Sequence, residues 1–347
     1  LHSLRRRQRQ MCIRDRAKEY SQIMARVKGV VSAEVGYSDS YVRELFLNTE
    51  GSRVVQERVY TRVALSATAV EGSNVQARYK SFGDQRGFGV VLGHEADAEK
   101  IASEAVELLS AEKVTGGTYT VILNPAIAGV FIHEAFGHLS EADHLHRNER
   151  LKEVMRIGER FGPPFLNVTD KPAPGEWGYY KYDHEGVEKK ITYLIKDGVL
   201  SGRLHSRLTA WIMGDEPTGN ARAINALYQP LVRMSATCIE PGDAETEEVL
   251  DISEGLLVID ALGGMTEMEM FTFTAQKAYL VKNGKPVKLL RDVVLSGNVF
   301  ETLKNIEKIG KEGYYWVGGC GKGGQYPLPV STFAPYVRIK NVLVGGK

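Results

Sequence analysis

The stretch FIHEAFGHLSEADHLH, residues 131–146, holds four of the chain's eight histidines beside three carboxylates. Imidazole nitrogens and carboxylate oxygens are common zinc ligands, and a glutamate directly after a ligating histidine is the general base of a well-known zinc motif. That motif places its two histidines four residues apart. Here His133 and His138 are five residues apart, so metal binding requires a local change in the helix that carries them.

A regular α-helix turns by about 100° per residue, so side chains five residues apart point about 140° away from each other. Two backbone solutions would bring His133 and His138 together: a π-helical turn, or a helix that ends at Gly137 so that His138 swings back. Both require unusual backbone angles immediately before His138, and glycine adopts such angles at low cost. Gly137 is therefore expected to be the point at which the helix changes.

A catalytic zinc site usually has three protein ligands and one open position. Candidates for the third ligand are Glu141, Asp143, His144, His146 and the distant Cys320. Cys320 lies between glycines in VGGCGKGGQ, where little crowds its sulfur, and Lys322 is close enough in sequence to stabilise a thiolate. A fourth protein ligand, such as His144 or Asp143, would instead indicate a closed structural site.

The elements that would position these residues can be read from the flanking sequence. TYTVILN predicts a strand, and Asn124 and Pro125 are a typical helix cap and first helical residue. The helix is therefore expected to run from Pro125 through the histidines. Residues 139–185 are polar and rich in turn residues, which predicts a long excursion over the surface.

The fold class expected from the whole pattern is α+β, with an N-terminal α/β domain followed by a β-rich C-terminal domain. Residues 30–71 alternate apolar and polar side chains, which predicts an antiparallel sheet, and residues 97–109 have helical spacing. Residues 187–347 read mostly as short strands. One helix is expected among them, over residues 298–310, with its apolar stripe on Val299, Leu303, Ile306 and Ile309.

Residues 1–16, LHSLRRRQRQMCIRDR, resemble translated adapter sequence and are interpreted as a non-native or disordered segment. Without their six arginines and one aspartate, the formal net charge of +1 becomes −4, so no nucleic-acid partner is expected. The alternative is a basic arm for nucleic acid. The remaining regions are expected to be a truncated N-terminal α+β domain (17–115), a strand, helix and long loop (116–186), and the β-rich domain (187–347).

Composition indicates a globular protein, because 43% of the residues are hydrophobic. No apolar run reaches the about 18 residues that span a membrane, and no signal peptide is recognised, so a cytoplasmic location without membrane contact is expected. Outside residues 1–16 only Cys238 and Cys320 remain, too few for a disulfide framework.

The order of motifs resembles the TldD branch of the TldD/PmbA family. HEAFGHLSEAD is followed some 180 residues later by GCGKGGQ, and the resemblance extends from about Ala17 to the C terminus. Further matching segments are LNTEGS, YDHEGV, LIKDGVLSG, TGNAR, VRMSAT, EPGD, GLLVIDALGG, VKNGKPV and VRIKNVLVGG. The chain departs from the family at Ala236, where asparagine is usual, and over residues 145–164.

The resemblance implies a zinc-dependent peptidase that hydrolyses unfolded or extended peptides. Zn²⁺ would be held by His133, His138 and Cys320, and Glu134 would be the general base that takes a proton from water. The implied partner is a PmbA-like subunit or a second copy of the chain. Substrate is expected to bind as an added strand, with residues 262–274 as the candidate wall. The alternative is a non-catalytic structural or partner subunit with a closed or empty metal site.

Overall fold

The computed structural model describes residues 2–267 and 269–346. It divides into two compact units: unit 1 contains the chain up to Val42 and Arg58–Glu112, and unit 2 contains Arg43–Glu57 and the chain from Lys113 onward. The regions 116–186 and 187–347 thus lie in the same unit. Helices together with extensive mixed sheet confirm the α+β class. Within the described residues, no helix is both long enough and apolar enough to cross a membrane.

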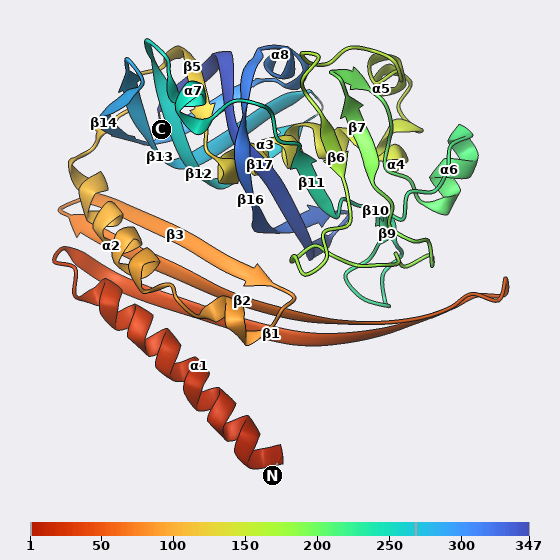
Figure 1. Ribbon diagram of the computed structural model, residues 1–347, viewed down its shortest axis with the longest axis horizontal. Helices are drawn as coiled ribbons and strands as arrows, with labels where there is room; N and C mark the ends of the chain where they lie inside the picture. The colour runs from red at the N-terminus through yellow and green to blue at the C-terminus, as the bar shows by residue number, and fades with distance from the viewer. Residues whose placement is uncertain (1, 268, 347) are drawn as a thin grey trace. The chain divides into compact units, whose positions relative to one another are not determined.

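Unit 1 is a three-stranded sheet, in the order β1-β2-β3, with two long helices (Figure 1). The elements are α1 (His2–Ala25), β1 (Val30–Leu47), β2 (Arg53–Glu71), β3 (Asn74–Asp84), a 3₁₀ turn (Phe88–Val91) and α2 (Glu95–Ser110). Every second residue of β2 from Val63 to Ala69 is buried, and these side chains share one core with α1 and α2. The helix expected over residues 97–109 is confirmed as α2, and α1 includes residues 2–16.

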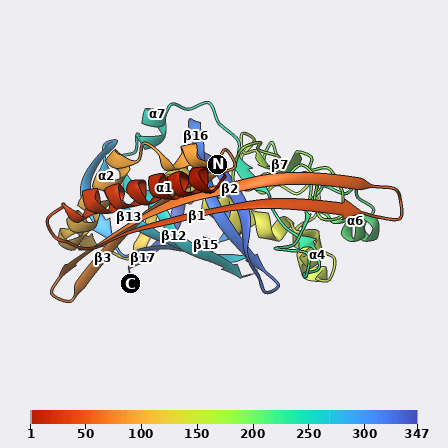
Figure 2. The same cartoon turned by 90° about the horizontal axis from the view of Figure 1, so that it is seen from below.

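The tip of the hairpin formed by β1 and β2 belongs to unit 2, and its side chains bond to other residues of that unit. Glu44 lies 3.2 Å from His184, and Glu50 lies 2.8 Å from Arg207. Gln56 donates to the carbonyl of Tyr182 at 2.8 Å. Figure 2 shows this tip beside α6 (Arg207–Met213).

Unit 2 is built on one large mixed sheet in which β5 and β17 are neighbours at the centre (Figure 1). Along the sheet the order is β14-β13-β12-β5-β17-β11-β6-β7-β8, with β15 paired to β13 and β17, and β16 paired to β17. A separate pair consists of β9 (Ala221–Arg222) and β10 (Leu231–Val232). The short β4 (Glu112–Lys113) lies where unit 1 ends and unit 2 begins in the sequence. The strands of the sheet are β5 (Gly117–Leu123), β6 (Val168–Asp170), β7 (Thr192–Lys196), β8 (Val199–Leu200), β11 (Ala236–Ile239), β12 (Glu254–Glu267), β13 (Met270–Lys282), β14 (Lys285–Arg291), β15 (Val293–Asn298), β16 (Ile306–Lys322) and β17 (Gln325–Gly346).

The apolar helix α3 (Pro125–Ile132) packs against β17, β12 and β11, in the middle of the unit 2 core (Figure 1). A side chain at Gly129 would place its Cβ 2.5 Å from Thr332 Oγ1, so glycine allows the helix to approach β17 closely. The remaining helices are short: α4 (Ala142–Leu145), α5 (Glu149–Val154), α6 (Arg207–Met213), α7 (Thr246–Leu250) and α8 (Val299–Lys304).

Two expectations about unit 2 are wrong. The helix predicted over residues 298–310 ends at Lys304, and Ile306 and Ile309 belong to β16, where they pair with Ile339 and Val337 of β17. Both isoleucines are buried as expected, but strand pairing with the neighbouring β17 decides their conformation. The helical spacing of four apolar residues did not distinguish a helix from a helix followed by a strand.

The polar segment 139–185 is not an excursion over the surface. Leu145, Met155 and Leu166 are fully buried in the main core, and Asp170 is fully buried as well. Several of its polar residues accept hydrogen bonds from other segments inside the protein, in place of water, as Glu141 does from Lys322 and Asp170 does from Ser235.

Candidate metal centre

The helix that carries His133 begins directly after the central strand β5. Asn124 caps it by accepting a hydrogen bond from the Ile127 amide at 3.2 Å, and Pro125 is the first helical residue, as predicted. The Asn124 side chain also exchanges two hydrogen bonds with Asp260, at 2.9 and 3.1 Å. These contacts attach the start of α3 to β12 and thereby fix the direction in which the helix enters the core.

The helix changes to a π-helical turn over His133–Gly137, followed by a 3₁₀ turn over His138–Ser140. The amide of His138 donates to the carbonyl of His133, five residues earlier. This wider turn places the two imidazoles on one side, with their ring centroids 5.2 Å apart. Of the two backbone solutions expected from the sequence, the structure contains the π-helical one.

Gly137 is required for a different reason from the one expected. Its φ of −58° and ψ of −51° are ordinary right-handed helical values, so its freedom to adopt unusual angles is not used. A Cβ at this position would instead lie 2.0 Å from Sδ of Met234, which is fully buried. Glycine is therefore needed here because it has no side chain.

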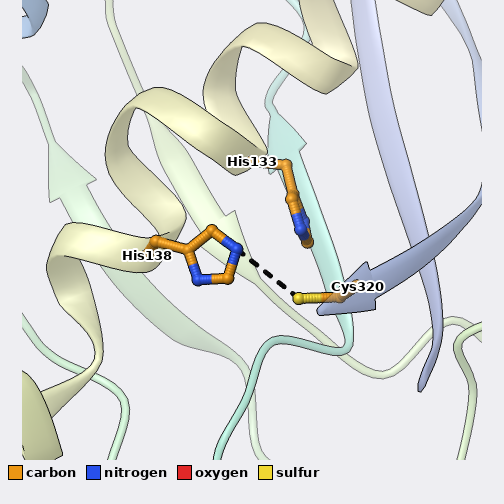
Figure 3. Close-up of side chains that lie close together, drawn as sticks. All are labelled: His133, His138 and Cys320. Carbon is orange, nitrogen blue, oxygen red and sulfur yellow. Dashed lines mark hydrogen bonds between the residues drawn. The ribbon is translucent and has the colours of Figure 1, made fainter. Parts of the chain in front are cut away.

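Cys320 reaches the two histidines from the hairpin formed by β16 and β17 (Figure 3). Its Sγ lies 3.5 Å from Nε2 of His138, and one ligand atom from each of His133, His138 and Cys320 falls within 4.8 Å of the others. Zinc–sulfur and zinc–nitrogen bonds of about 2.3 and 2.05 Å at a tetrahedral angle would place S and N about 3.6 Å apart. The observed separation therefore fits two ligands of one ion.

The donor set suits zinc, because two imidazoles and a thiolate are ligands that this ion prefers. Burial raises the pKa of the Cys320 thiol, but hydrogen bonds and charges from His133 and His138 outweigh it and lower the pKa to about 5. Nδ1 of His133 is buried with no hydrogen-bond partner among the described residues, as expected of a site completed by a ligand.

Lys322 does not stabilise the thiolate in the way the sequence suggested. Its ammonium group lies 2.9 Å from a carboxylate oxygen of Glu141 and 2.6 Å from one of Asp143. Glu141 in turn lies 3.0 Å from Nδ1 of His138. Glu141 is therefore a partner of a candidate ligand and not itself a member of the three-residue group.

The other candidate ligands form a second group. Glu141, Asp143 and His144 also have ligand atoms within 4.8 Å of one another, separately from the first group. His146 turns away and bonds through Nδ1 to the carbonyl of Ala142 at 3.0 Å. Within the described residues, no fourth histidine, cysteine or carboxylate belongs to the His133–His138–Cys320 group.

A cleft of about 640 Å³ opens next to the three residues. Glu134, whose side chain is 25% exposed, lines it together with His138, and its Oε2 lies 3.9 Å from Nε2 of that histidine. Other parts of the lining come from β12 at residues 264–266 and from β16 at Gly319, Gly321 and Lys322. The cleft therefore brings the Glu134 carboxylate and one candidate metal ligand, His138, to one solvent-accessible space.

Arg233 is a residue of this site that the sequence reasoning missed. Its guanidinium group is fully buried and donates to the backbone carbonyl of Cys320 at 2.7 Å. No spacing rule connects residues 233 and 320, so only the folded structure reveals the contact. Lys322 was noticed because it stands beside Cys320, but its true partners lie on the histidine-bearing segment.

Both units correspond to known domain families. The PmbA/TldA metallopeptidase C-terminal domain matches residues 116–346, and the PmbA/TldA metallopeptidase central domain matches residues 11–111. A metalloprotease of Synechocystis sp. is 46% identical over 321 residues, which cover 91% of this chain and 69% of the relative. The zinc metalloprotease TldD homolog of Saccharolobus solfataricus is 31% identical over 339 residues, covering 96% of this chain and 76% of the relative.

Solved structures share the fold. A crystal structure from Thermotoga maritima superposes with a TM-score of 0.79 at 24% identity, covering 95% of this chain and 73% of the other. TldE from Thermococcus kodakarensis gives a TM-score of 0.73 at 22% identity, covering 95% and 72%. At these levels of sequence identity, the two structural similarities are evidence of a shared fold alone.

Proposed function

Because the chain belongs to the PmbA/TldD family of metallopeptidases, we propose that it is a zinc-dependent peptidase whose ion is held by His133, His138 and Cys320. The observation that carries this proposal is the 3.5 Å separation between Cys320 Sγ and His138 Nε2, two atoms whose residues are 182 positions apart in the chain. A spacing that fits a shared zinc ion, between residue types that bind zinc, is difficult to explain by packing alone.

Glu134 is the general base in this proposal. A zinc ion bound by the three residues would lower the pKa of a water molecule and polarise the peptide carbonyl. Glu134 takes a proton from water while the water oxygen bonds to the carbonyl carbon. It then gives that proton to the leaving nitrogen as the carbon–nitrogen bond breaks. Its position on the cleft wall beside His138 allows both transfers.

The substrate class is an extended peptide that adds a strand to the wall of the cleft. Within the described residues, β5 pairs with β12 only from Leu256 to Val258, whereas β13 accompanies β12 on its other side as far as Glu267. The backbone of residues 262–267 can therefore bond a peptide on the side away from β13. Main-chain hydrogen bonds do not depend on the side chains of the peptide, so substrates of varied sequence can bind. An unfolded chain has main-chain amide and carbonyl groups available for such bonds.

A partner subunit is part of the proposal, as either a PmbA-like chain or a second copy of this one, in the cytoplasm. The competing function is a structural subunit whose metal site is closed by a fourth protein ligand. The separate grouping of His144 and Asp143 favours an open site. His144→Ala should therefore retain one zinc ion per chain, whereas Cys320→Ala should lose it, as measured by metal analysis of the purified proteins.

Glu134→Gln tests the catalytic role directly. The variant should bind zinc as the wild type does, because Glu134 is not a ligand, but hydrolysis of an unfolded protein substrate should fall by about 10²- to 10⁴-fold. Glu312→Gln, an exposed position on β16, serves as the matched control and should keep full activity. Full peptidase activity in Glu134→Gln would refute the assignment.

A further inference from the structure

The ammonium group of Lys322 is held by three acceptors in a nearly buried position. Its Nζ lies 2.9 Å from Glu141 Oε2, 2.6 Å from Asp143 Oδ1 and 2.9 Å from the carbonyl oxygen of Val232. The side chain is only 8% exposed. Three donors therefore meet three acceptors, which is the full capacity of a lysine ammonium group.

The two carboxylates that hold Lys322 also belong to the second group of metal-binding residue types. Glu141, Asp143 and His144 could hold a cation by composition and distance. Lys322 already places a positive charge within hydrogen-bond distance of both carboxylates. The protein itself thus supplies one positive charge against the two negative charges of the cluster.

One oxygen atom connects Lys322 to a candidate zinc ligand. Oε2 of Glu141 lies 2.9 Å from Lys322 Nζ and 3.0 Å from Nδ1 of His138. A hydrogen on Nδ1 directed at this carboxylate leaves Nε2 as the free lone pair. Nε2 is the atom that lies 3.5 Å from Sγ of Cys320. The carboxylate of Glu141 therefore orients the His138 ring through Nδ1, the nitrogen that does not face Cys320. This arrangement is common among zinc-bound histidines.

The same contact joins the two segments that carry the ligands. Lys322 lies two residues after Cys320, and Glu141 lies three residues after His138. The bond between their side chains ties the hairpin of β16 and β17 to the chain that follows the π-helical turn. A protein contact that needs no metal ion therefore joins the segments that carry Cys320 and His138.

We propose that Lys322 is a positioning residue that preassembles the zinc site, acting through Glu141 on His138 and holding the hairpin that carries Cys320. The inference rests on the proposed function for the identity of the ligands. It goes beyond that function because it assigns a role to a residue that neither binds the ion nor touches the reacting atoms.

Lys322→Met tests the proposal, with zinc affinity measured by competition against a chelator. The variant should bind zinc about 10- to 100-fold more weakly, the usual effect of removing a group that orients a ligand. After cobalt substitution, its thiolate-to-cobalt absorption should also change. Lys311→Met, at an exposed lysine on the same strand, should leave both readouts unchanged. Wild-type zinc affinity and cobalt absorption in Lys322→Met would overturn the proposal.

A double mutant distinguishes positioning from general loss of structure. If Lys322 acts through Glu141, then Lys322→Met combined with Glu141→Gln should weaken zinc binding little more than Glu141→Gln alone. Multiplication of the two single effects would contradict the proposal. If Lys322→Met does not fold, Glu141→Gln alone carries the test, since it must weaken zinc binding and alter the cobalt absorption while the chain stays folded; wild-type values in that variant would reject the inference.

The failure of this inference can be told apart from that of the proposed function. Zinc affinity and cobalt absorption report on the site whether or not peptides are cleaved. A wild-type chain that binds zinc through Cys320 but cleaves no peptide would remove the peptidase proposal and leave the role of Lys322 measurable. A wild-type chain without a cysteine-bound metal would remove both.

Discussion

Cys320 is buried, yet its thiol has a pKa well below the ordinary value for cysteine. The cause is the pair of imidazoles against which it packs, which favour a negative sulfur. Cys238, the other buried cysteine, has no such neighbours, and burial raises the pKa of its thiol. The two residues therefore differ in charge at neutral pH, although both are enclosed. The reactivity of a cysteine in this chain therefore depends on the charged and polar groups around its sulfur and not on how deeply the residue is buried.

The charge on Cys320 gives the first prediction at the scale of single residues. In the metal-free protein, the thiolate should be present at neutral pH and should be lost as the pH falls through about 5. The sign follows from the lowered pKa, because a proton returns to the sulfur only in more acidic solution. The ultraviolet absorbance of the thiolate, measured as wild type minus Cys320→Ser, should show this transition. A midpoint near the ordinary cysteine value of about 8.5 would contradict it.

The order of motifs along the chain, through its resemblance to a known family, led to the prediction of His133, His138, Cys320 and Glu134 as the site, and the structure brings the first three together. The same information did not reveal what Gly137 and Lys322 do. Gly137 is constrained by Met234 and Lys322 by Glu141 and Asp143, and all of these contacts join segments that are distant in sequence. Such constraints exist only after folding.

At the scale of elements, the π-helical turn is the structural basis of the site, because it converts a five-residue spacing into one shared face. Its position is set from both ends. Asn124 and Asp260 fix the start of α3, and Met234 packs against the turn at Gly137. The turn itself could be anticipated from the spacing of the histidines, but the packing that selects it over an early helix end could not.

Gly137→Ala tests this account of the turn. Alanine favours helix over glycine by up to about 1 kcal/mol, but its Cβ would overlap the buried Met234 sulfur, and overpacking usually costs about 1–3 kcal/mol. We therefore expect a net loss of stability and weaker zinc binding. Gly345→Ala, at a glycine with open space around it, should change neither. Urea unfolding and chelator competition measure the two effects, and an unchanged zinc affinity in Gly137→Ala would contradict this account.

The errors at this scale share one cause. Ile306 and Ile309 fit a helical stripe as well as they fit a strand, and only pairing with β17 decides between these. The sequence pattern of residues 139–185 predicts solvent exposure, but several of their polar side chains are buried and have hydrogen-bond partners inside the protein. The local sequence pattern predicts the conformation of α3 and β5 correctly, because the contacts of these elements favour the same conformation. The pattern fails where pairing with a distant strand favours a different conformation.

At the scale of the whole molecule, unit 2 contains the complete candidate site. The three candidate ligands, Glu134 and the cleft all lie in this unit. The segment that sequence analysis separated as residues 116–186 supplies the histidines, and the β-rich region supplies the cysteine. Segments from distant parts of the chain must therefore pack together in this unit before the site can form.

A buried ion pair contributes to that long-range order. Lys189 Nζ lies 2.8 Å from Asp170 Oδ1, and both side chains are completely buried. Asn220 and the amide of Ser235 also donate to the Asp170 carboxylate, at 3.0 and 2.8 Å. Burial alone would raise the pKa of Asp170, but these partners lower it. Four segments of unit 2 therefore meet at one carboxylate.

Lys189→Met should destabilise the protein by about 3–5 kcal/mol, because it leaves the Asp170 charge buried without its partner. The additional change Asp170→Asn should recover much of that loss, since it removes the unpaired charge and keeps the amide as a hydrogen-bond partner. Lys311→Met, at an exposed lysine, is the control and should have little effect. Urea unfolding at pH 7 measures the free energy of each variant. A small loss in Lys189→Met, or no recovery in the double variant, would show that the pair does not hold these segments.

The same pair predicts how stability depends on pH. Because its pKa is lower in the folded chain than the about 3.9 of an unfolded aspartate, Asp170 stabilises the wild type above that value, and this stabilisation is lost as the pH falls through the folded value. In Lys189→Met, the carboxylate loses the charge that lowers its pKa, so it takes up a proton at higher pH and the buried charge disappears. The difference in unfolding free energy between wild type and Lys189→Met should therefore shrink as the pH is lowered from 7 toward 4. Urea unfolding across this range measures it, and a difference that stays constant would mean that the loss comes from packing and not from charge.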